Sequence, residues 1–365
     1  MSADPSDDMV ATVLAEGARR RARFFAGIAL LAVALFGCAT LGISLGAVHL
    51  SFTEVWATVG HHVLGEGSRA GLGSDAIIWE IRSPRVVLGA LAGAGLSVVG
   101  VMVQAMVRNP LADPYVMGVE SGAAAAAVGL IYLGRTQAYS GRIGPTLAGF
   151  AGAVATLVVV FALARRNGQV SSVRLLLVGV SVSYALGGLT SFFLYASPAG
   201  RQDGSVLFWI LGGLGGAVWS QVPLAAAIVG AGFGLAWYHS RPLNALAVGD
   251  ESATALGISP DRLRTRLLLI SAVLVAALVS IVGPIGFVGL VVPHVGRMLF
   301  GADHRRLIPA ALLLGAIYLV LVDLAARLVL APSELPIGVV TSVLGTPFFL
   351  WLIRRRDGSS LREAG

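Results

Sequence analysis

Long apolar runs separated by short polar connections dominate the chain. The first run extends from Phe24 to about Gly46 and follows an acidic N-terminal stretch and a group of arginines. It is too long for the core of a cleavable signal peptide, and no small-residue cleavage site closes it. Because a helix of about 20 mostly apolar residues crosses the hydrocarbon core of a bilayer, we predict that this run is the first membrane-spanning helix.

Further apolar runs emerge when a window of about 19 residues is moved along the sequence. They lie near 84–107, 115–133, 143–164, 174–196, 221–238, 265–282, 286–300, 306–330 and 335–353. These runs predict an all-α, polytopic membrane protein with about ten transmembrane helices. We expect a tail over 1–23, a transmembrane domain over 24–353 and a second tail over 354–365, with the N- and C-termini cytoplasmic.

Composition and charge agree with a chain that lies mostly outside water. Hydrophobic residues make up 56% of the chain and charged residues only 12%, about half the charged fraction of an ordinary soluble domain. All 26 basic residues are arginine, and the net charge is +7. With the N-terminus inside, 19 arginines fall in the predicted cytoplasmic segments and 7 outside, as the positive-inside rule requires. The charge therefore reports membrane topology, and nucleic acid is not expected as a partner.

Enzymatic chemistry is not expected. The chain has no lysine, so it cannot contain the GxxxxGK[ST] phosphate-binding loop of an ATPase. Its single cysteine, Cys38, excludes a disulfide and a cysteine-based metal site. The histidines show no metal-ligand spacing except the adjacent pair His61 and His62, which falls in a predicted outer loop. We expect surface histidines there, with contact to a metal or haem as the alternative. No metal site and no bound cofactor are predicted.

Two connections contain prolines. The segment from Arg108 to Pro114 holds an Asn-Pro pair and a second proline, which force a non-helical turn. A stiff cytoplasmic hairpin and a functional contact are equally compatible with this turn. The segment from Gly283 to Leu290 contains a Gly-Pro break. Such a break can line a transport pathway, but we favour a tight outer hairpin.

The predicted cytoplasmic segment 241–266 contains a candidate interaction helix. Its residues are Gly249, Asp250, Glu251, Ser252, Ala253, Thr254, Ala255, Leu256, Gly257 and Ile258. Asp250 is a fair N-cap, and Gly257 would end the helix after two turns. Such a helix either stabilises the membrane surface or is gripped by a soluble partner. Its small side chains suit insertion into a groove of another protein better than burial in lipid.

Several stretches in register resemble one known family. They are Arg82-Ser83-Pro84-Arg85, Gly93, Gly100, Gln104, 108–114, Gly118, 249–257, 283–297, 323–327 and 334–341. This pattern resembles the FecCD-type permeases, which are the membrane subunits of ATP-driven importers for ferric siderophores, haem and cobalamin. Long motifs in order are more specific than any single motif. The resemblance runs from about residue 80 to 353, and the part before it matches only as a generic first span.

The resemblance implies a ten-helix, cobalamin-permease-like subunit in the inner membrane of a bacterium. It implies a second copy of the chain, with the pathway along the two-fold axis between the copies. Two ATPase subunits, which use ATP and Mg, would dock inside, and a periplasmic or lipoprotein substrate-binding protein would dock outside. Segment 249–258 would then be the coupling helix that fits a cleft on the ATPase. In the family, helices matching 174–196, 205–215 and 335–351 border the pathway.

Polar side chains on and after the fifth apolar run are candidates for lining that pathway. They are Ser183, Tyr184, Ser191, Tyr195 and Arg201. They would make a wide, weakly polar conduit without a dedicated cage, so they do not identify the substrate. Family frequency ranks ferric siderophore first, then haem and cobalamin. The competing classes are a gradient-driven secondary transporter and a structural membrane scaffold. The secondary transporter is disfavoured because few carboxylates, chiefly Glu120 and Asp323, lie in the spans.

Three arginines lie at predicted outer helix ends, against the positive-inside trend. These are Arg82, Arg85 and Arg327. One interpretation is that they face acidic side chains of the delivering protein, as at matching positions in the family, because a guanidinium group offers a bidentate fork to carboxylates. For Arg327 the alternative is an ion pair with Asp323 one turn earlier. We favour docking for Arg82 and Arg85 and leave both interpretations open for Arg327.

Overall fold

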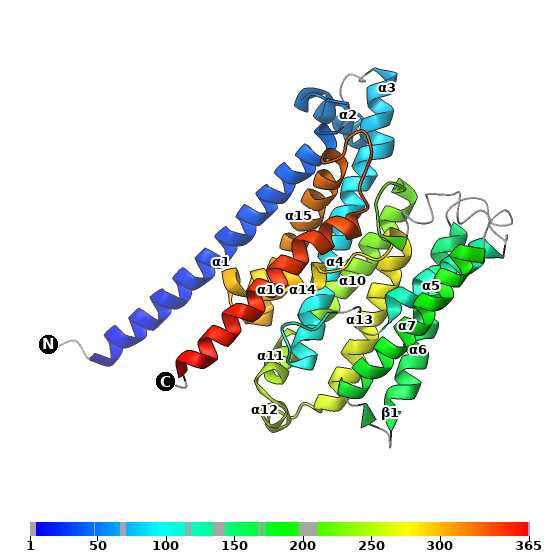
Figure 1. Cartoon of the computed structure of the whole chain (residues 1–365). Helices are drawn as coiled ribbons and strands as arrows, with labels where there is room; N and C mark the ends of the chain where they lie inside the picture. The colour runs from blue at the N-terminus through cyan, green and yellow to red at the C-terminus, as the bar shows by residue number, and fades with distance from the viewer. Residues whose placement is uncertain are drawn as a thin grey trace.

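Helices account for nearly all of the residues that the structure, a computed structural model, describes (Figure 1). The described residues are 5–46, 48–65, 71–113, 115, 118–133, 143–166, 169–170, 172–196 and 210–363. Within them, 7 helices are long and apolar enough to cross a membrane. They belong to α1 (Pro5–Ser44), α4 (Ser83–Val107), α6 (Ile143–Ala164), α7 (Ser172–Ala196), α10 (Val222–Tyr238), α13 (Pro260–Val282) and α15 (His304–Leu328).

Three other apolar helices are too short, over their apolar part, to be counted as spans. They are α5 (Val119–Tyr132), α14 (Val288–Phe300) and the apolar part, Ile337–Leu352, of α16 (Ile337–Glu363). Each of the predicted apolar runs therefore coincides with a helix, and α1 and α16 extend well beyond their runs at the N- and C-terminal sides. The expected number of complete crossings stays a prediction. The segments assigned to the two tails continue α1 and α16 as helix.

The remaining elements are short and lie at the two ends of the bundle. They are α2 (Phe52–Leu64), α3 (Leu72–Asp75), the π-helical η1 (Ala76–Arg82), η4 (Trp219–Gln221), α11 (Ser240–Val248), α12 (Asp250–Ala255) and the antiparallel two-residue strands β1 (Arg165–Arg166) and β2 (Gln169–Val170). One end of the bundle holds the N-terminal end of α1, the C-terminal end of α16, and α11, α12 and β1 (Figure 1). The other end holds α2 and α3. Following the arginine distribution, we call these the cytoplasmic end and the outer end.

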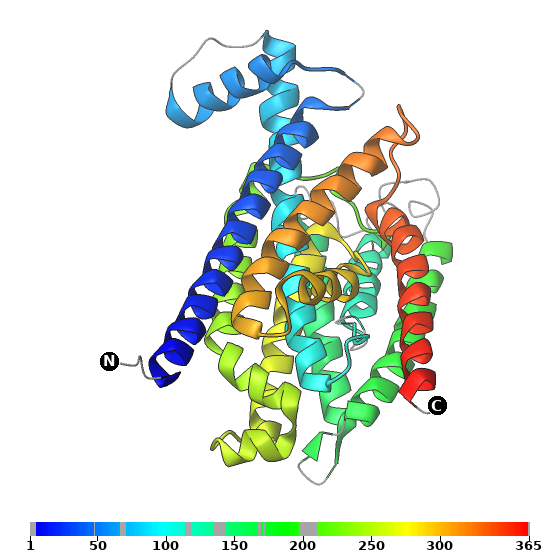
Figure 2. The same cartoon turned by 90° about the vertical axis from the view of Figure 1, so that its left-hand side faces the viewer.

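Helix α4 runs through the middle of the bundle, with other helices around it (Figures 1 and 2). Nearly all of its residues are buried. Two of its glycines allow neighbouring backbones to approach: a Cβ on Gly93 would overlap the carbonyl of Gly315 in α15, and one on Gly100 would overlap that of Gly289 in α14. In lipid, helices associate through such close contacts rather than through a hydrophobic effect. Helix α4 is therefore the central packing element of the chain.

The Gly-Pro break between α13 and α14 is an interior segment rather than the predicted outer hairpin. Gly283, Pro284 and Ile285 are buried. The amide of Ile285 donates to the hydroxyl of Tyr115 at 3.2 Å, and Gly283 and Phe287 both adopt positive φ, 71° and 67°. Buried backbone amides and carbonyls need partners, and here the tyrosine hydroxyl supplies one. The hairpin prediction is wrong because the break turns inward and is covered by other segments.

Candidate functional site

The short helix α12 lies at the cytoplasmic end, directly after α11 (Figure 1). It ends in a Schellman motif, as the sequence predicts: Gly257 is left-handed with φ 74°, and the amide of Ile258 donates to the carbonyl of Ala253 at 3.0 Å. The N-cap differs from the prediction. Gly249 occupies that position, and Asp250 is the first helical residue without a side-chain cap.

The carboxylate of Asp250 is instead engaged by arginines from other elements. Arg264 of α13 donates to both of its oxygens, with Nη1 2.9 Å from Oδ2. The Nε of Arg264 also donates to the carbonyl of Met106 at the end of α4, at 3.0 Å. Arg108 lies 3.6 Å from Asp250 Oδ1. These contacts, led by the hydrogen bonds from Arg264, lower the pKa of Asp250. Helix α12 is therefore tied to α13 and to α4 at once.

The proline-containing turn after α4 contributes to this arrangement. Arg108 adopts a left-handed conformation with φ 54°. The side chain of Asn109 accepts a hydrogen bond from the amide of Leu111 at 3.0 Å, which is an Asx turn. The turn is therefore stiff, and it also places Arg108 beside Asp250.

The solvent-facing side of α12 exposes the small residue Ala255 beside the polar residues Glu251 and Thr254. Ala253 is fully buried, whereas Ala255 and Leu256 are exposed. Val248, at the end of α11, is also strongly exposed. An exposed apolar surface rimmed by polar groups marks a protein interaction site when it is contiguous. The geometry of α12 suits a contact with a soluble partner at this end.

A buried ionic cluster joins α4 and α15 near the outer end. Arg85 Nε donates to Asp323 Oδ1 at 2.9 Å, and Arg85 Nη1 donates to Glu334 Oε2 at 2.8 Å. Arg327 Nε donates to Asp323 Oδ2 at 3.0 Å, so the predicted ion pair within α15 is confirmed. No local pattern in the sequence pairs Glu334 with Arg85, because the two residues are 249 positions apart.

The other guanidinium donors of this region bind the end of α1. Arg82 donates to the carbonyls of Ile43 and Ser44 at 2.8 and 2.9 Å, and Arg327 Nη2 donates to the carbonyl of Gly42 at 2.8 Å. These are the carbonyls that a helix C-terminus leaves without intrahelical partners. The arginines therefore cap α1 and fasten it to η1 and α15.

The docking role predicted for the three outer arginines does not fit these positions. The side chains of Arg82, Arg85 and Arg327 are each less than a tenth exposed. Their guanidinium groups donate to carboxylates and carbonyls of this chain. These groups are therefore not presented to carboxylates of another protein. Positive charge at an outer helix end indicated a surface role, but apart from Asp323, which is one turn from Arg327, the partners of these arginines lie far away in the sequence.

A second interhelical contact missed by the sequence analysis involves Gln104 of α4. Its amide nitrogen donates to the carbonyl of Gly289 at 3.1 Å, and its oxygen accepts from Arg297 Nη2 at 2.6 Å. Gln104 is buried. A polar residue inside an apolar helix was the available signal, since such residues hydrogen-bond across helices in membranes.

Helix α7 presents most of the predicted pathway residues. Tyr184 and Tyr195 are 80% and 77% exposed, and Ser191 is exposed between them. Their spacing of seven and four residues places them on one helix face. Ser183 is partly buried and donates to the carbonyl of Gly179 at 2.8 Å. Arg201 lies outside the described residues.

The paired histidines of α2 do not form a metal site with the residues described here. His62 Nε2 lies 3.1 Å from Asp75 Oδ1, and its ring stacks on Trp79 with centroids 4.4 Å apart. In the described part of the chain, no group of three or more His, Cys, Asp or Glu side chains is placed to hold a metal ion. Its aspartate and tryptophan contacts make His62 part of the packing of the outer end.

Comparison with known proteins decides the family. The model of the FecCD transport family matches residues 31–355. The chain belongs to the FecCD transport family. The match confirms the resemblance seen in the motifs and extends it into α1, where the sequence showed only a generic span.

Relatives of this FecCD chain are transport permeases with several different cargoes. The cobalamin import system permease BtuC of Halobacterium salinarum is 41% identical over 79% of this chain and 76% of its own length. The hemin transport system permease HmuU of Yersinia pestis is 39% identical over 86% and 90%. The Fe(3+) dicitrate transport system permease FecD of Escherichia coli is 36% identical over 89% and 97%.

A solved structure has the same fold as this FecCD chain. It is described as an inward-facing conformation of a metal-chelate type ABC transporter. The TM-score is 0.77 and the sequence identity 30%, with 90% of this chain and 98% of that chain covered. The FecCD chain is thus a multi-pass membrane protein whose relatives are permeases rather than enzymes.

Proposed function

We propose that this chain is the permease subunit of an ATP-binding-cassette importer that moves an iron complex into the cytoplasm. The observation that carries the proposal is the attachment of α12. This helix is exposed on one side and joined through Asp250 and Arg264 to α13 and to the end of α4. A push on α12 by a soluble partner would therefore reach the central helix of the chain directly.

The partner proposed at α12 is an ATPase subunit, one for each of two copies of the chain. The chain supplies no phosphate-binding lysine, so ATP and Mg would be bound by that partner. The exposed side chains of Ala255, Leu256 and Val248 are the contact surface that we assign to it. Residues 249–258 then act as the coupling helix.

The pathway is proposed to lie between two copies, with α7 and α16 facing it. Tyr184, at the middle of α7, and Ser191 place hydroxyl groups on an exposed helix face. Lipid would disfavour these groups at that depth, because aromatic residues with polar tips concentrate at membrane interfaces. Helix α16 likewise exposes Ser342 and Thr346, one turn apart. Both faces suit a hydrated path used in alternating access.

The substrate proposal follows from the relatives. Their names include cobalamin, hemin and ferric dicitrate, so the family carries large metal chelates. Within that class we propose a ferric siderophore first, with haem and cobalamin as alternatives. A substrate-binding protein would deliver the chelate at the outer end of a chain in the inner membrane of a bacterium.

A gradient-driven secondary transporter is the second hypothesis, and the ionic cluster speaks against it. Proton or sodium coupling needs a carboxylate that gains and loses its ion during transport. Both oxygens of Asp323 accept hydrogen bonds, one from Arg85 and one from Arg327, so this carboxylate is already engaged within the chain. This favours the ATP-driven mechanism.

The deciding experiment reconstitutes the chain in liposomes with the ATPase and binding protein encoded beside it. ATP hydrolysis and uptake are measured with the binding protein empty or loaded with ferric siderophore, haem or cobalamin. Stimulation and uptake with one chelate would support the importer and identify its cargo. If no ATPase assembles with the chain and no chelate moves, the proposed mechanism is wrong.

A further inference from the structure

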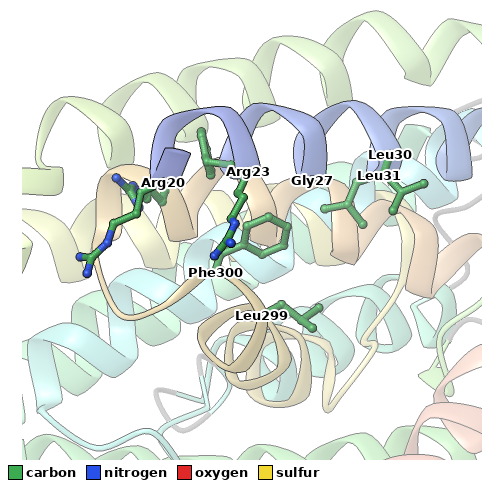
Figure 3. A pocket seen from close by; sticks show the side chains of 9 residues that line it. Arg20, Arg23, Gly27, Leu30, Leu31, Leu299 and Phe300 are labelled. Atoms are coloured by element: carbon green, nitrogen blue, oxygen red, sulfur yellow. The ribbon is translucent and has the colours of Figure 1, made fainter. Parts of the chain in front are cut away.

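A crevice of about 430 Å³ opens between α1, the end of α14 and the start of α15 (Figure 3). It is lined by Arg20, Arg23, Phe24, Gly27, Leu30, Leu31, Leu299, Phe300 and Arg306. Basic side chains occupy one end of this set, and apolar side chains occupy the rest. Nothing in the transport proposal uses this crevice, which lies on the outside of the bundle away from α12 and α7.

The position of the crevice along α1 matches the boundary between lipid headgroups and acyl chains. From Arg23 to Ser44, where α1 ends, the helix rises about 30 Å at 1.5 Å per residue. That is the thickness of the hydrocarbon core of a bilayer. Arg20 and Arg23 therefore lie at headgroup depth. Gly27 and Leu30 lie about 6–10 Å deeper on the same helix, beside acyl chains.

The charge of the crevice is unbalanced. Arg20 and Arg23 are one turn apart on α1, and Arg306 comes from the start of α15. Its lining includes no carboxylate, and the ion pairs found between described residues involve none of these three arginines. Figure 3 shows Arg20 and Arg23 projecting from α1 on the side of Phe300. Three guanidinium groups lining one crevice at this depth suit a phosphodiester, to which arginine donates in a bidentate manner.

The deeper part of the crevice is apolar and accessible. The ring of Phe300 packs against Gly27, where a Cβ would come within 2.7 Å of it, and it meets Phe24 edge-on at 6.1 Å. Leu30 and Leu299 remain largely exposed beside it. A free phosphate ion would leave this apolar floor uncovered, whereas an acyl chain attached to the phosphate would cover it.

We propose that this crevice is a binding site for an anionic glycerophospholipid of the cytoplasmic leaflet. The phosphate binds Arg20, Arg23 and Arg306, and one acyl chain lies over Gly27, Leu30 and Leu299. The lipid bridges α1 to the end of α14 and the start of α15. Only 6% of the membrane window of α1 is buried by protein, so lipid covers most of this helix. The site is independent of the cargo and of the ATPase.

The test compares two triple variants with the same change in net charge. R20Q/R23Q/R306Q removes the crevice arginines, and R19Q/R21Q/R305Q removes their sequence neighbours, which do not line the crevice. Each protein is purified in detergent and titrated with phosphatidylglycerol, with phosphatidylcholine and with glycerol 3-phosphate. Native mass spectrometry measures the bound lipid, and a thermal ramp measures the unfolding midpoint.

We expect the wild type and R19Q/R21Q/R305Q to bind one phosphatidylglycerol tightly and to unfold at a higher temperature with it. The crevice variant should bind roughly 100-fold more weakly, because each arginine contributes about fivefold near a membrane surface. R20K/R23K/R306K, which keeps the charge, should retain most of the binding. Equal binding by both glutamine variants, or equal binding of phosphatidylcholine, would overturn the proposal. Binding of glycerol 3-phosphate with the same affinity would show an anion site without the acyl chain and would overturn it as well.

Discussion

Arg85 and Asp323 are 238 positions apart in the chain, yet their side chains meet inside it with Nε 2.9 Å from Oδ1. Both are buried, and Arg327 shares the same carboxylate. One carboxylate therefore balances two guanidinium groups, with Glu334 completing the cluster at the edge. This relationship replaces a surface role for the outer arginines with a structural one.

The first prediction concerns that carboxylate. Asp323→Asn should destabilise the chain strongly, by about 3–5 kcal/mol, since removing one partner leaves buried charge uncompensated. Glu334→Gln is the matched control, and it should cost less than about 1 kcal/mol because Glu334 is partly exposed. Thermal unfolding of both variants in the same detergent checks the difference. Equal losses would contradict the assignment of Asp323 as the centre of the cluster.

A second prediction tests the backbone contact between α4 and α15. Gly93→Ala places a methyl group on the carbonyl of Gly315, which cannot move away as a flexible side chain would. We expect a loss of about 1–3 kcal/mol. Gly230→Ala in α10 is the control, because no atom lies within 4 Å of its added Cβ. That variant should be neutral or slightly stabilised, since alanine is the better helix former. The unfolding midpoint should fall in Gly93→Ala and should stay the same or rise slightly in Gly230→Ala.

The third prediction addresses the contact surface of α12. Ala255→Arg should abolish co-purification with the ATPase while leaving the chain folded in the membrane, because Ala255 is exposed. Ala253 is unsuitable for this purpose, since it is fully buried and a large side chain there would disturb the fold itself. Ala302→Arg, in the exposed α14–α15 turn of the same end, is the control and should keep the complex. A complex that survives Ala255→Arg would remove α12 from the proposed interface.

The fourth prediction concerns the anchor of α12. Because the folded-state pKa of Asp250 lies below the ordinary value, the stability that its ion pair contributes is present at neutral pH. It is lost only as the pH falls through the lowered pKa. Asp250→Asn should therefore accelerate hydrogen exchange of the α12 amides at pH 7 by about fivefold, as for an exposed ion pair. Asp261→Asn, an exposed change in the next helix, should leave exchange unchanged. Identical exchange in Asp250→Asn and the wild type would show that α12 is held by other contacts.

A fifth prediction uses the single cysteine of the chain, Cys38. In a Cys38→Ser background, Tyr184→Cys and Ser191→Cys should react with a charged, membrane-impermeant thiol reagent if their face of α7 is hydrated. Leu189→Cys, on another face of α7, is the control and should react much more slowly, because a charged reagent does not enter lipid. Equal labelling at the three positions would argue against a pathway along this face.

The sequence predicts elements well where the signal is local. Apolar runs locate the helices because a bilayer imposes their length, and Gly257 marks the end of α12 because its φ of 74° is easy only for glycine. The outer helix α2 was not predicted, since hydropathy averages away an amphipathic helix. Its capping box, in which Ser51 and Glu54 bind each other's backbone, is a readable signal in the sequence.

The candidate site could be predicted only in part, because its partners come from distant segments. Residues 249–258 were recognisable as a short cytoplasmic helix. The hydrogen bonds from Arg264 to Asp250 and to the carbonyl of Met106 could not be predicted from the sequence. The same holds for the buried arginines. The sequence does not distinguish an arginine at a helix end that binds another protein from one that binds Asp323. Hydropathy also gives no sign that the Gly-Pro break turns inward.

The close contacts of α4 with α14 and α15 limit how the chain can change shape. Glycine backbones that touch leave no slack for one helix to slide or bend past another. We therefore expect the part of the chain formed by α4, α14 and α15 to move as one rigid body. Conformational changes would then be concentrated where the chain contacts other proteins. These helices themselves would tilt as one rigid unit.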